Sequence, residues 1–579
     1  MAIISICNNQ EVFYQLDSTY SDFYNKSYEC EEAFGLAETF SKLNVKTANH
    51  YVSGSGDFAL GVGSFLVDGT FLDQDALKII LKDFNTPQFS RSRITGVFCI
   101  AVYKSRKLTI FVDESSDYDL FYHIDDKVVT ITNSFYHLAR TLDGVKVDEA
   151  ALAQKLFYLN ILGNKSPFLG VDRLLGNQCI VWDVERGWNV LPFNRMVSIT
   201  AESVISYSYE RYKGINRLFE NSALFMTGGQ DSRLMLSFLL RQGFKPSLIY
   251  GESDSPSLIT RKNDKQIVET IAEKMELPIT IENWSNNRTN FEIALEKYGE
   301  YALDYGYNAN YLASFERCKA ELIESGYNIE LFRNVDVVRG FENKYLSLDE
   351  FISKIYLGRN LKTLLSDWQE LWANMRVSLE ALCKELGLDK THLSCEDCVS
   401  LLAAAFYPSS INFFNIANRF AYSFSFLGDW DIGQKLANIP PKDKAKSKMQ
   451  IAAIKSFCPE LLNFPFFSHI REQTLKGGKA YLEDKHKALV RVKRVVQKSI
   501  PKNAIYKYLR ILYRRLTGNT GDIVEINQEA SLVREIYDDL QGSIVLFGID
   551  PKAMSEEYAL LTQAEMFVAY DKLLKQVLK

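Results

Sequence analysis

The segment that most constrains the fold is Leu224–Arg233, LFMTGGQDSR, in which an apolar run passes through two glycines into a polar helix start. Residues 224–227 predict a buried strand and Ser232 to Gln242 a helix that stops at Gly243. Further strands are predicted at 247–250 and 279–282, with a helix at 265–275 between them, capped by Asn263 or Asp264. This alternation predicts a parallel sheet that binds ligands beyond the carboxyl ends of its strands.

The loop after the first of these strands has the composition of an anion site. Its glycines allow close approach of the backbone, and the N–H groups of the helix start attract negative charge. Thr227 and Ser232 add hydroxyls, and Asp231 offers a carboxylate for Mg²⁺. We therefore predict a pyrophosphate site formed by Thr227, Gly228, Gly229, Gln230, Asp231 and Ser232. The alternative is a tight strand-to-helix turn without a ligand.

The chain changes character along its 579 residues, a length typical of several domains. Residues 1–200 predict short strands separated by turns, including the apolar run at 97–103 and a hairpin at Asp125-Asp126. Residues 201–480 begin with the strand and helix alternation and become mainly helical from about 300. Residues 481–579 predict a helical tail that is basic at 485–515 and acidic from 521. The basic segment is either a solvated helical face that packs against the acidic segment after it, or a binding site for an anionic substrate or a peptide.

Composition excludes several classes of protein. A net charge of −5 with 47% hydrophobic residues argues against disorder and against general nucleic-acid binding. Nine scattered cysteines do not form a disulfide framework, and Cys395 and Cys398 are a single CxxC pair, which does not favour zinc. No apolar run is long enough to span a membrane and the N-terminus lacks an export signal, so we expect a cytoplasmic protein.

The motif Thr227-Gly-Gly-Gln-Asp-Ser232 resembles the SGGxDS loop of the PP-loop ATP pyrophosphatases, with Thr in place of the first Ser. A sheet-rich domain of about 200 residues before it resembles the layout of class B asparagine synthetases, β-lactam synthetases and lasso-peptide cyclases. The resemblance implies an α/β protein with an α+β N-terminal domain. It implies an Ntn-hydrolase-like sheet sandwich at 1–200, a PP-loop domain at 201–480 and the helical tail at 481–579.

The resemblance also suggests roles for residues outside the loop. Phe332–Gly340 is similar in position to the family's second acidic loop, which makes Asp336 a second magnesium ligand beside Asp231. Residues 427–448 resemble the family's PFLDxxLVE…LPP…K segment. Tyr250, Gly251 and Glu252 would lie beside the nucleoside. Lys448, Arg333 and Arg339 are candidates for steadying the charge that develops during AMP transfer, or else ordinary surface cations.

Departures from the family pattern exclude one activity. Glutamine-dependent members expose a cysteine at position 2, where this chain has Ala, and Cys7 lies inside the predicted first strand. Residues 112–122 resemble the family's RDxxGxxPLYY segment without its arginine, and Tyr422 and Phe424 stand where many relatives have Glu-x-Arg. We therefore predict a glutaminase-like fold without glutaminase activity.

The sequence thus predicts an ATP- and Mg²⁺-dependent carbon–nitrogen ligase that adenylates a carboxylate, releases pyrophosphate and forms an amide or lactam without glutamine. Its substrate is a small molecule or peptide that carries a carboxylate, with an amine as the acceptor. Assembly into a homo-oligomer and binding to a biosynthetic partner protein are both left open. Binding to a membrane or to a specific nucleic acid is not expected. The alternatives are an amidotransferase-like enzyme of surface-polysaccharide biosynthesis and a catalytically silent nucleotide-binding regulator.

Overall fold

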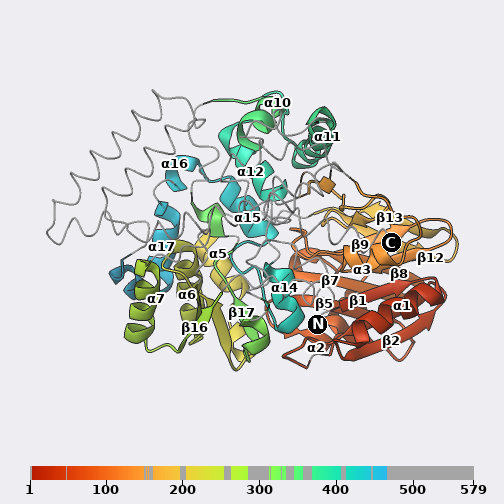
Figure 1. Ribbon diagram of the computed structural model, residues 1–579, viewed down its shortest axis with the longest axis horizontal. Helices are drawn as coiled ribbons and strands as arrows, with labels where there is room; N and C mark the ends of the chain where they lie inside the picture. Colours follow the sequence, from red (N-terminus) through yellow and green to blue (C-terminus); the bar gives the residue numbers. More distant parts are fainter. Residues whose placement is uncertain are drawn as a thin grey trace, which may run out of the picture.

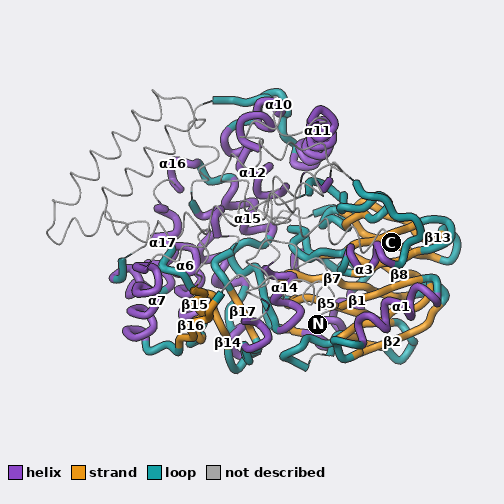
Figure 2. Tube along the Cα trace, in the orientation of Figure 1, coloured by secondary structure: helices purple, strands orange, loops and turns teal. Residues whose placement is uncertain are grey.

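The computed structural model describes residues 3–46, 48–148, 151–152, 154, 161–195, 204–252, 262–284, 312, 314–327, 329–333, 344–356, 368–405, 413–444 and 447–465. The predicted tail at 481–579 lies outside these residues, as do Asp336 and Arg339. Within the described part, two antiparallel sheets come first in the chain and a parallel sheet with most of the helices follows (Figures 1 and 2). The protein is therefore a mixed α/β protein, as the sequence predicts.

The first sheet has the strand order β11-β9-β10-β1-β3-β2 and the second β13-β12-β8-β7-β5-β4, with β6 paired to β5. The strands of the first sheet are β1 (Ile3–Cys7), β2 (Lys26–Glu32), β3 (Gly35–Phe40), β9 (Phe121–Ile124), β10 (Val129–Thr132) and β11 (Asp172–Arg173). Those of the second are β4 (His50–Val52), β5 (Phe58–Val67), β6 (Phe71–Leu72), β7 (Ile94–Lys104), β8 (Lys107–Val112), β12 (Gln178–Asp183) and β13 (Gly187–Pro192). Their helices are α1 (Gln10–Ser21), α2 (Asp73–Asp83), η1 (Arg91–Arg93) and α3 (Phe135–Arg140).

Both sheets contribute to one hydrophobic core, with α1 packed on β1 and β3 and α2 packed on β5. The strand β5 is buried along its whole length and β7 along all but its last residue, because each of their faces is covered. The apolar run at 97–103 lies within β7, as predicted. The predicted hairpin also forms, since Asp125 accepts hydrogen bonds from the N–H groups of Lys127 and Val128 at 2.7 and 2.6 Å.

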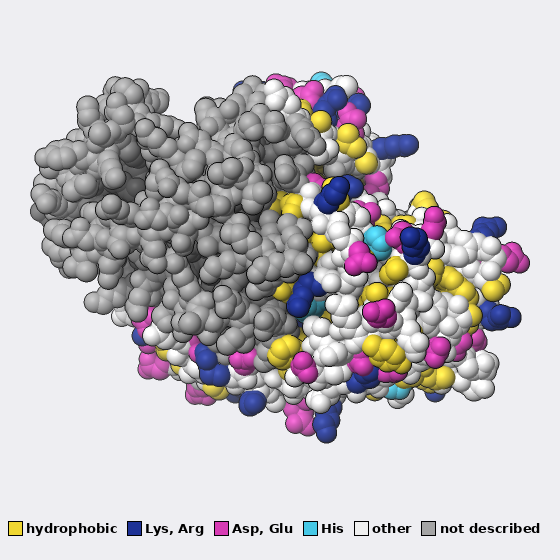
Figure 3. All heavy atoms as spheres, turned by 45° about the vertical axis from the view of Figure 1, so that its right-hand side comes forward, with side chains coloured by type: hydrophobic (Ala, Val, Ile, Leu, Met, Phe, Trp, Pro, Cys, Tyr) yellow, Lys and Arg dark blue, Asp and Glu magenta, His cyan; other side chains and the backbone are white. Residues whose placement is uncertain are grey.

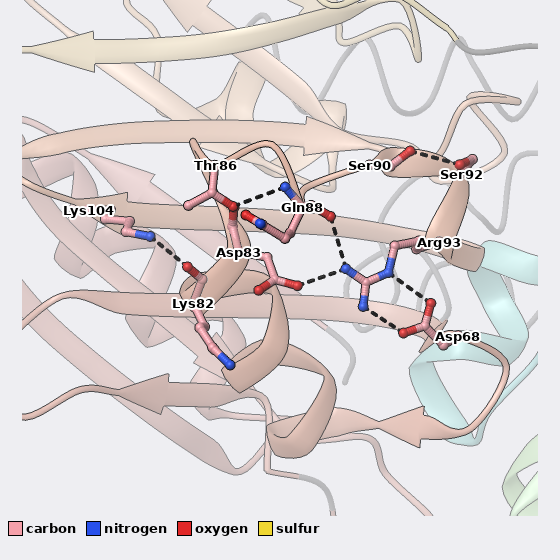
Figure 4. A network of polar contacts seen from close by, with 9 residues as sticks. All are labelled: Asp68, Lys82, Asp83, Thr86, Gln88, Ser90, Ser92, Arg93 and Lys104. Atoms are coloured by element: carbon pink, nitrogen blue, oxygen red, sulfur yellow. Dashed lines mark hydrogen bonds and ion pairs between the residues drawn. The ribbon is translucent and has the colours of Figure 1, made fainter.

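A network of polar contacts fixes the end of α2 to the second sheet (Figure 4). The guanidinium of Arg93 contacts Asp68, in the turn after β5, and Asp83, at the end of α2, each at 2.7 Å. Lys104, the last residue of β7, donates from Nζ to carbonyls at the helix C-terminus, those of Leu81, Lys82 and Phe84. A cation suits this position because the last carbonyls of a helix lack partners and carry partial negative charge.

The second half of the chain is built on a parallel sheet with the order β16-β15-β14-β17. Its strands are β14 (Ser222–Phe225), β15 (Ser247–Glu252), β16 (Ile279–Asn283) and β17 (Leu322–Glu324), and the helices α6 (Gln230–Arg241) and α7 (Lys262–Met275) connect the first three. The predicted parallel sheet is confirmed, with element ends shifted by up to three residues. The strand order reverses at β14, because β15 and β16 lie on one side of it and β17 on the other. Ligands of such sheets bind at this switch point.

β17 is a short strand in the part of the chain after residue 300, which is mainly helical within the described residues, as predicted. Its three buried residues pair in parallel with β14. The segment around Tyr422 runs alongside it, with the Ile323 N–H donating to the Tyr422 carbonyl at 2.8 Å and the Phe424 N–H donating to Glu324 at 2.8 Å. Tyr422 and Phe424 therefore flank the sheet next to the switch point.

The other helices of the described part follow here in chain order. They are α5 (Val204–Arg211), η2 (Ile215–Arg217), η5 (Ile329–Phe332), α10 (Leu348–Phe351), the π-turn Ile352–Tyr356, α11 (Trp368–Leu386), α12 (Cys395–Ala405), α14 (Phe413–Phe420), α15 (Trp430–Ala437), α16 (Pro441–Lys444), α17 (Lys448–Phe457) and η10 (Pro459–Asn463). α17 packs against α6, while α14 lies between the parallel sheet and β5 (Figure 1). None of the described helices combines the length and the apolar character needed to cross a bilayer.

The helix α14 joins the two halves through buried polar contacts. The Asn415 amide donates to the Asp117 carbonyl at 2.8 Å and accepts from the Asp119 N–H at 3.0 Å. Lys42 donates to the Asn418 side chain at 2.8 Å. Such contacts fix one relative orientation, because a shifted interface would leave buried polar groups unpaired. On the described part of the face seen in Figure 3, basic and acidic side chains are interspersed.

Candidate functional site

The predicted loop lies at the carboxyl end of β14, where Thr227, Gly228 and Gly229 connect the strand to α6. The Ser232 hydroxyl closes it, since it accepts from the Thr227 N–H at 3.1 Å and donates to the Thr227 carbonyl at 3.0 Å. The N-cap residue of α6 is Gly229, which has no side chain to cap the helix. A 12-residue helix thus begins at the strand end with its positive end directed to this edge of the sheet.

Two glycines lie in close contacts around the loop, Gly326 against backbone and Gly228 against the end of a side chain. A Cβ atom on Gly326, two residues after β17, would lie 2.5 Å from the Ser232 nitrogen. A Cβ on Gly228 would lie 2.6 Å from a carboxylate oxygen of Asp264. The chain on the far side of the switch point therefore lies directly against the start of α6, and this approach depends on the absence of a side chain.

The carboxylate of Asp231 is held from two sides. The fully buried Gln450, on α17, donates from Nε2 to one carboxylate oxygen in a very short contact. Arg333, directly after η5, places a guanidinium nitrogen 3.5 Å from the other oxygen. Burial raises the pKa of Asp231, and the Arg333 charge and the Gln450 hydrogen bond oppose that shift. The predicted metal ligand and the predicted cation Arg333 are therefore brought together.

Asp264 makes a contact that the sequence does not reveal. It was expected to cap α7 but lies within the first turn of that helix. Its carboxylate accepts the Gly228 N–H at 2.8 Å. A backbone donor of the predicted pyrophosphate loop is thus bonded to an internal anion.

The other predicted residues divide into three groups. Tyr250, Gly251 and Glu252 end β15, the strand next to β14, where a Cβ on Gly251 would clash with the Trp284 ring at 2.3 Å and Glu252 pairs with Lys265 at 3.0 Å. Lys448 starts α17 but is exposed and donates to the Lys442 carbonyl at 3.3 Å. It is Gln450, two residues further along the same helix, that contacts Asp231. Asp336 and Arg339 lie outside the described residues.

Behind the loop, the buried Arg233 ties α6 to the turn that follows α17. Its guanidinium donates to the carbonyls of Leu461, Phe464 and Pro465 at 3.4, 2.8 and 2.7 Å. Burial lowers the pKa of Arg233 to about 10. The start of α6 is therefore anchored from its inner side, which keeps the loop in a fixed position.

The donor set around Asp231 fits magnesium. Mg²⁺ prefers oxygen ligands, and this part of the chain offers a carboxylate and the hydroxyls of Thr227 and Ser232. The Oε1 atom of Gln450 is buried and has no hydrogen-bond partner within the described part of the chain, which leaves an amide oxygen beside the carboxylate. These residues suit a hard cation accompanied by an anion.

Three other candidate sites are weaker. Cys7 lies inside β1, buried and in contact with the Thr130 hydroxyl at 3.5 Å, and burial raises the pKa of its thiol. A raised pKa disfavours the thiolate that a nucleophile needs. Among the described residues, the group arranged to hold a metal ion is Asp17, Glu29 and Glu38, and the ammonium of Lys26 already lies among them. Cys395 and Cys398 are buried and do not belong to such a group.

Neither a protein-family model nor a curated protein sequence matches the chain. Among solved structures it is similar to an allosteric regulatory enzyme of purine biosynthesis, with 9% identity, a TM-score of 0.23 and coverage of 49% of this chain and 65% of that one. It is also similar to a glutamine phosphoribosylpyrophosphate amidotransferase from B. subtilis complexed with ADP and GMP, with 8% identity, a TM-score of 0.24 and coverage of 50% and 68%. A U34-tRNA thiolase from Methanococcus maripaludis shows 14% identity, a TM-score of 0.17 and coverage of 46% and 82%.

These TM-scores describe a partial likeness of the backbone, so no property of those proteins is transferred to this chain. Its own architecture defines it as a mixed α/β protein in which two antiparallel sheets precede a parallel sheet. A strand–Gly–Gly–helix loop lies at the switch point of that parallel sheet, with a carboxylate in its first helical turn.

Proposed function

We propose that this protein is an ATP- and Mg²⁺-dependent synthetase that adenylates a carboxylate and joins it to an amine without using glutamine. The observation that carries the proposal is the loop Thr227–Ser232 at the switch point, with Asp231 held between Gln450 and Arg333. A glycine-rich helix start binds the pyrophosphate end of a nucleotide, and a carboxylate in its first turn binds the accompanying cation.

In the proposed reaction a carboxylate oxygen attacks the α-phosphorus of ATP, and the bond to pyrophosphate breaks. The amine then attacks the carbonyl of the mixed anhydride, loses a proton, and AMP leaves with the electron pair. Mg²⁺ supplies neutralisation of the phosphate charge. The chain positions the reactants: Asp231 orients the cation, the loop N–H groups bind phosphate oxygens, and Arg333 offers a positive charge beside them.

Several roles stay proposals that follow from the sequence. Asp336 would complete the cation site, and Arg339 and Lys448 would add positive charge during AMP transfer. Tyr250, Gly251 and Glu252 end the neighbouring strand and would lie beside the nucleoside. The amine comes from within the same substrate, in ring closure, or from a separate molecule.

The buried position of Cys7 in β1 supports a glutamine-independent enzyme. The purified full-length chain is therefore expected to release no glutamate from glutamine. Turnover of glutamine to glutamate would contradict this part of the proposal.

The synthetase activity is tested by ATP–pyrophosphate exchange across a panel of carboxylic acids. We expect exchange with at least one acid, and its loss in Asp231→Asn, which removes the charge that binds the cation. Asp126→Asn, which removes an exposed carboxylate from the β9–β10 turn, is the matched control and should exchange normally. Nucleotide binding without exchange for any acid would favour a silent nucleotide-binding regulator instead. Exchange that survives in Asp231→Asn would contradict the role of Asp231 in binding the cation.

A further inference from the structure

We propose that Asp264 and Arg333 make this site selective for pyrophosphate groups that carry a divalent cation, because they already neutralise both halves of the site from within the chain. The proposal rests on the proposed function and concerns the form of the ligand that the loop accepts. It assigns a role to Asp264 and a second role to Arg333.

The part of the site that would bind phosphate is the loop around Gly228, and its Gly228 N–H is hydrogen-bonded to Asp264. The Gly228 N–H, which a phosphate oxygen would accept, donates to the Asp264 carboxylate at 2.8 Å. Gly228 has no side chain, and this is what allows the carboxylate to lie so close to the loop. A phosphate oxygen that takes this N–H has to displace a negative charge, and it is repelled by that charge as it approaches. Asp264 is only partly buried.

The part of the site that would bind the cation is the Asp231 carboxylate, and it is paired with Arg333. Its guanidinium lies 3.5 Å from one oxygen of Asp231, where it supplies the positive charge that a bound cation would otherwise bring. Gln450 holds the other oxygen and is fully buried, so the carboxylate itself is fixed. The Arg333 side chain is 46% exposed and can therefore leave Asp231 without disturbing the core.

The two contacts make the halves depend on each other. A free anion meets Asp264 and gains little from Arg333, which is paired with Asp231. A free cation meets a carboxylate that is already neutralised. A cation–pyrophosphate complex brings both charges together: the cation takes Asp231, the released Arg333 pairs with phosphate oxygens, and the Gly228 N–H turns from Asp264 to the phosphate. Binding of cation and anion is therefore expected to be strongly cooperative.

An alternative role for Asp264 is to hold the loop by its hydrogen bond alone. Asp264→Asn separates the two roles, because the amide oxygen still accepts the Gly228 N–H while the negative charge is gone. A change in anion affinity in this variant therefore reports the charge and not the geometry.

The first experiment measures inorganic pyrophosphate binding to the full chain by calorimetry, with EDTA or with Mg²⁺. We expect Mg²⁺ to tighten binding by the wild-type protein about tenfold or more, within the usual range of coupling between sites. In EDTA, Asp264→Asn should bind pyrophosphate about tenfold more tightly than wild type. Glu273→Gln is the matched control, since it removes a charge from the exposed face of the same helix, and it should leave the affinity within about twofold.

The second experiment measures Mn²⁺ binding by electron paramagnetic resonance without pyrophosphate. Arg333→Gln should bind Mn²⁺ about tenfold more tightly than wild type, because Asp231 is no longer neutralised. Arg376→Gln, at an arginine of similar exposure that pairs with Asp349, should bind as wild type does. Arg333 is at the surface, so this arm remains informative even if Asp264→Asn does not fold.

The proposal is overturned if Mg²⁺ and pyrophosphate bind independently, or if pyrophosphate does not bind in the presence of Mg²⁺. It is also overturned if Asp264→Asn does not tighten pyrophosphate binding in EDTA and Arg333→Gln does not tighten Mn²⁺ binding without pyrophosphate. Its failure is distinguishable from failure of the synthetase proposal. Cooperative binding of Mg²⁺ and pyrophosphate without ATP–pyrophosphate exchange would support the roles of Asp264 and Arg333 and contradict the synthetase activity. Exchange with independent binding of the two ions would support the synthetase activity and contradict these roles.

Discussion

Replacing Glu324 by Gln should change the pH dependence of stability in a defined way. Glu324 ends β17 beside the switch point and is completely buried. One carboxyl oxygen accepts the Phe424 N–H at 2.8 Å, and the other has no hydrogen-bond partner within the described residues. Burial raises the pKa of Glu324 well above its ordinary value, because a single hydrogen bond cannot replace the hydration of a carboxylate.

The direction of the effect follows from proton binding in the two states. Between the unfolded pKa, about 4.3, and the raised folded pKa, the folded protein holds a proton that the unfolded chain has released. The free energy of unfolding therefore falls as pH rises, by about 1.4 kcal/mol for each pH unit in this interval. The contribution of Glu324 is complete below about pH 4 and is lost as pH rises through the folded pKa. Gln at this position stays neutral and keeps the acceptor for Phe424.

We expect the Glu324→Gln protein to match wild type below about pH 4 and to exceed its stability by about 1.4 kcal/mol for each pH unit above the unfolded pKa, until the folded pKa is passed. Urea unfolding at half-unit steps from pH 5 to 8, followed by circular dichroism, gives the difference between the two proteins. Other buried carboxyls cancel in that difference, and the exposed Glu273→Gln should show no such slope. Parallel curves for wild type and Glu324→Gln would refute the assignment of a buried neutral carboxyl.

Two further predictions concern the loop itself. Gly326→Ala should abolish pyrophosphate binding or unfold the parallel sheet, because its Cβ would lie 2.5 Å from the Ser232 nitrogen, whereas Gly54→Ala, with no atom within 4 Å, should have no effect in calorimetry or thermal melting. Gln450→Leu should weaken Mg²⁺-dependent pyrophosphate binding about tenfold, because losing a hydrogen bond to a charged group costs about 1.5 kcal/mol or more. Unchanged affinity in that variant would show that Gln450 does not orient Asp231.

The sequence predicted those elements whose signal is local. β15, α6 and α7 carry apolar residues with the spacing of their element, and glycines mark the ends of β14 and α6, so their positions were predicted within three residues. The loop was recognised for the same reason, because strand, glycines and helix start are contiguous.

The sequence missed the features that depend on distant contacts. β17 has three residues, too few for a periodic signal, and it is a strand because it pairs with β14 about 100 residues earlier. Gln450 contacts Asp231 across 219 positions of sequence, since α17 packs against α6. Asp264 had the chemistry of a helix cap, and only the proximity of Gly228 revealed its contact.

The position of α14 bears on how the chain can be divided. The N–H groups of Leu43 and Asn44, in the first domain, donate to the carbonyls of Arg419 and Phe420 at 3.0 and 2.9 Å. A fragment ending near residue 200 would lose these acceptors, together with the apolar cover that α14 gives to β5. The predicted boundary near residue 200 therefore separates β5 and residues 43–44 from a helix that lies more than 200 residues later in the chain and completes their contacts.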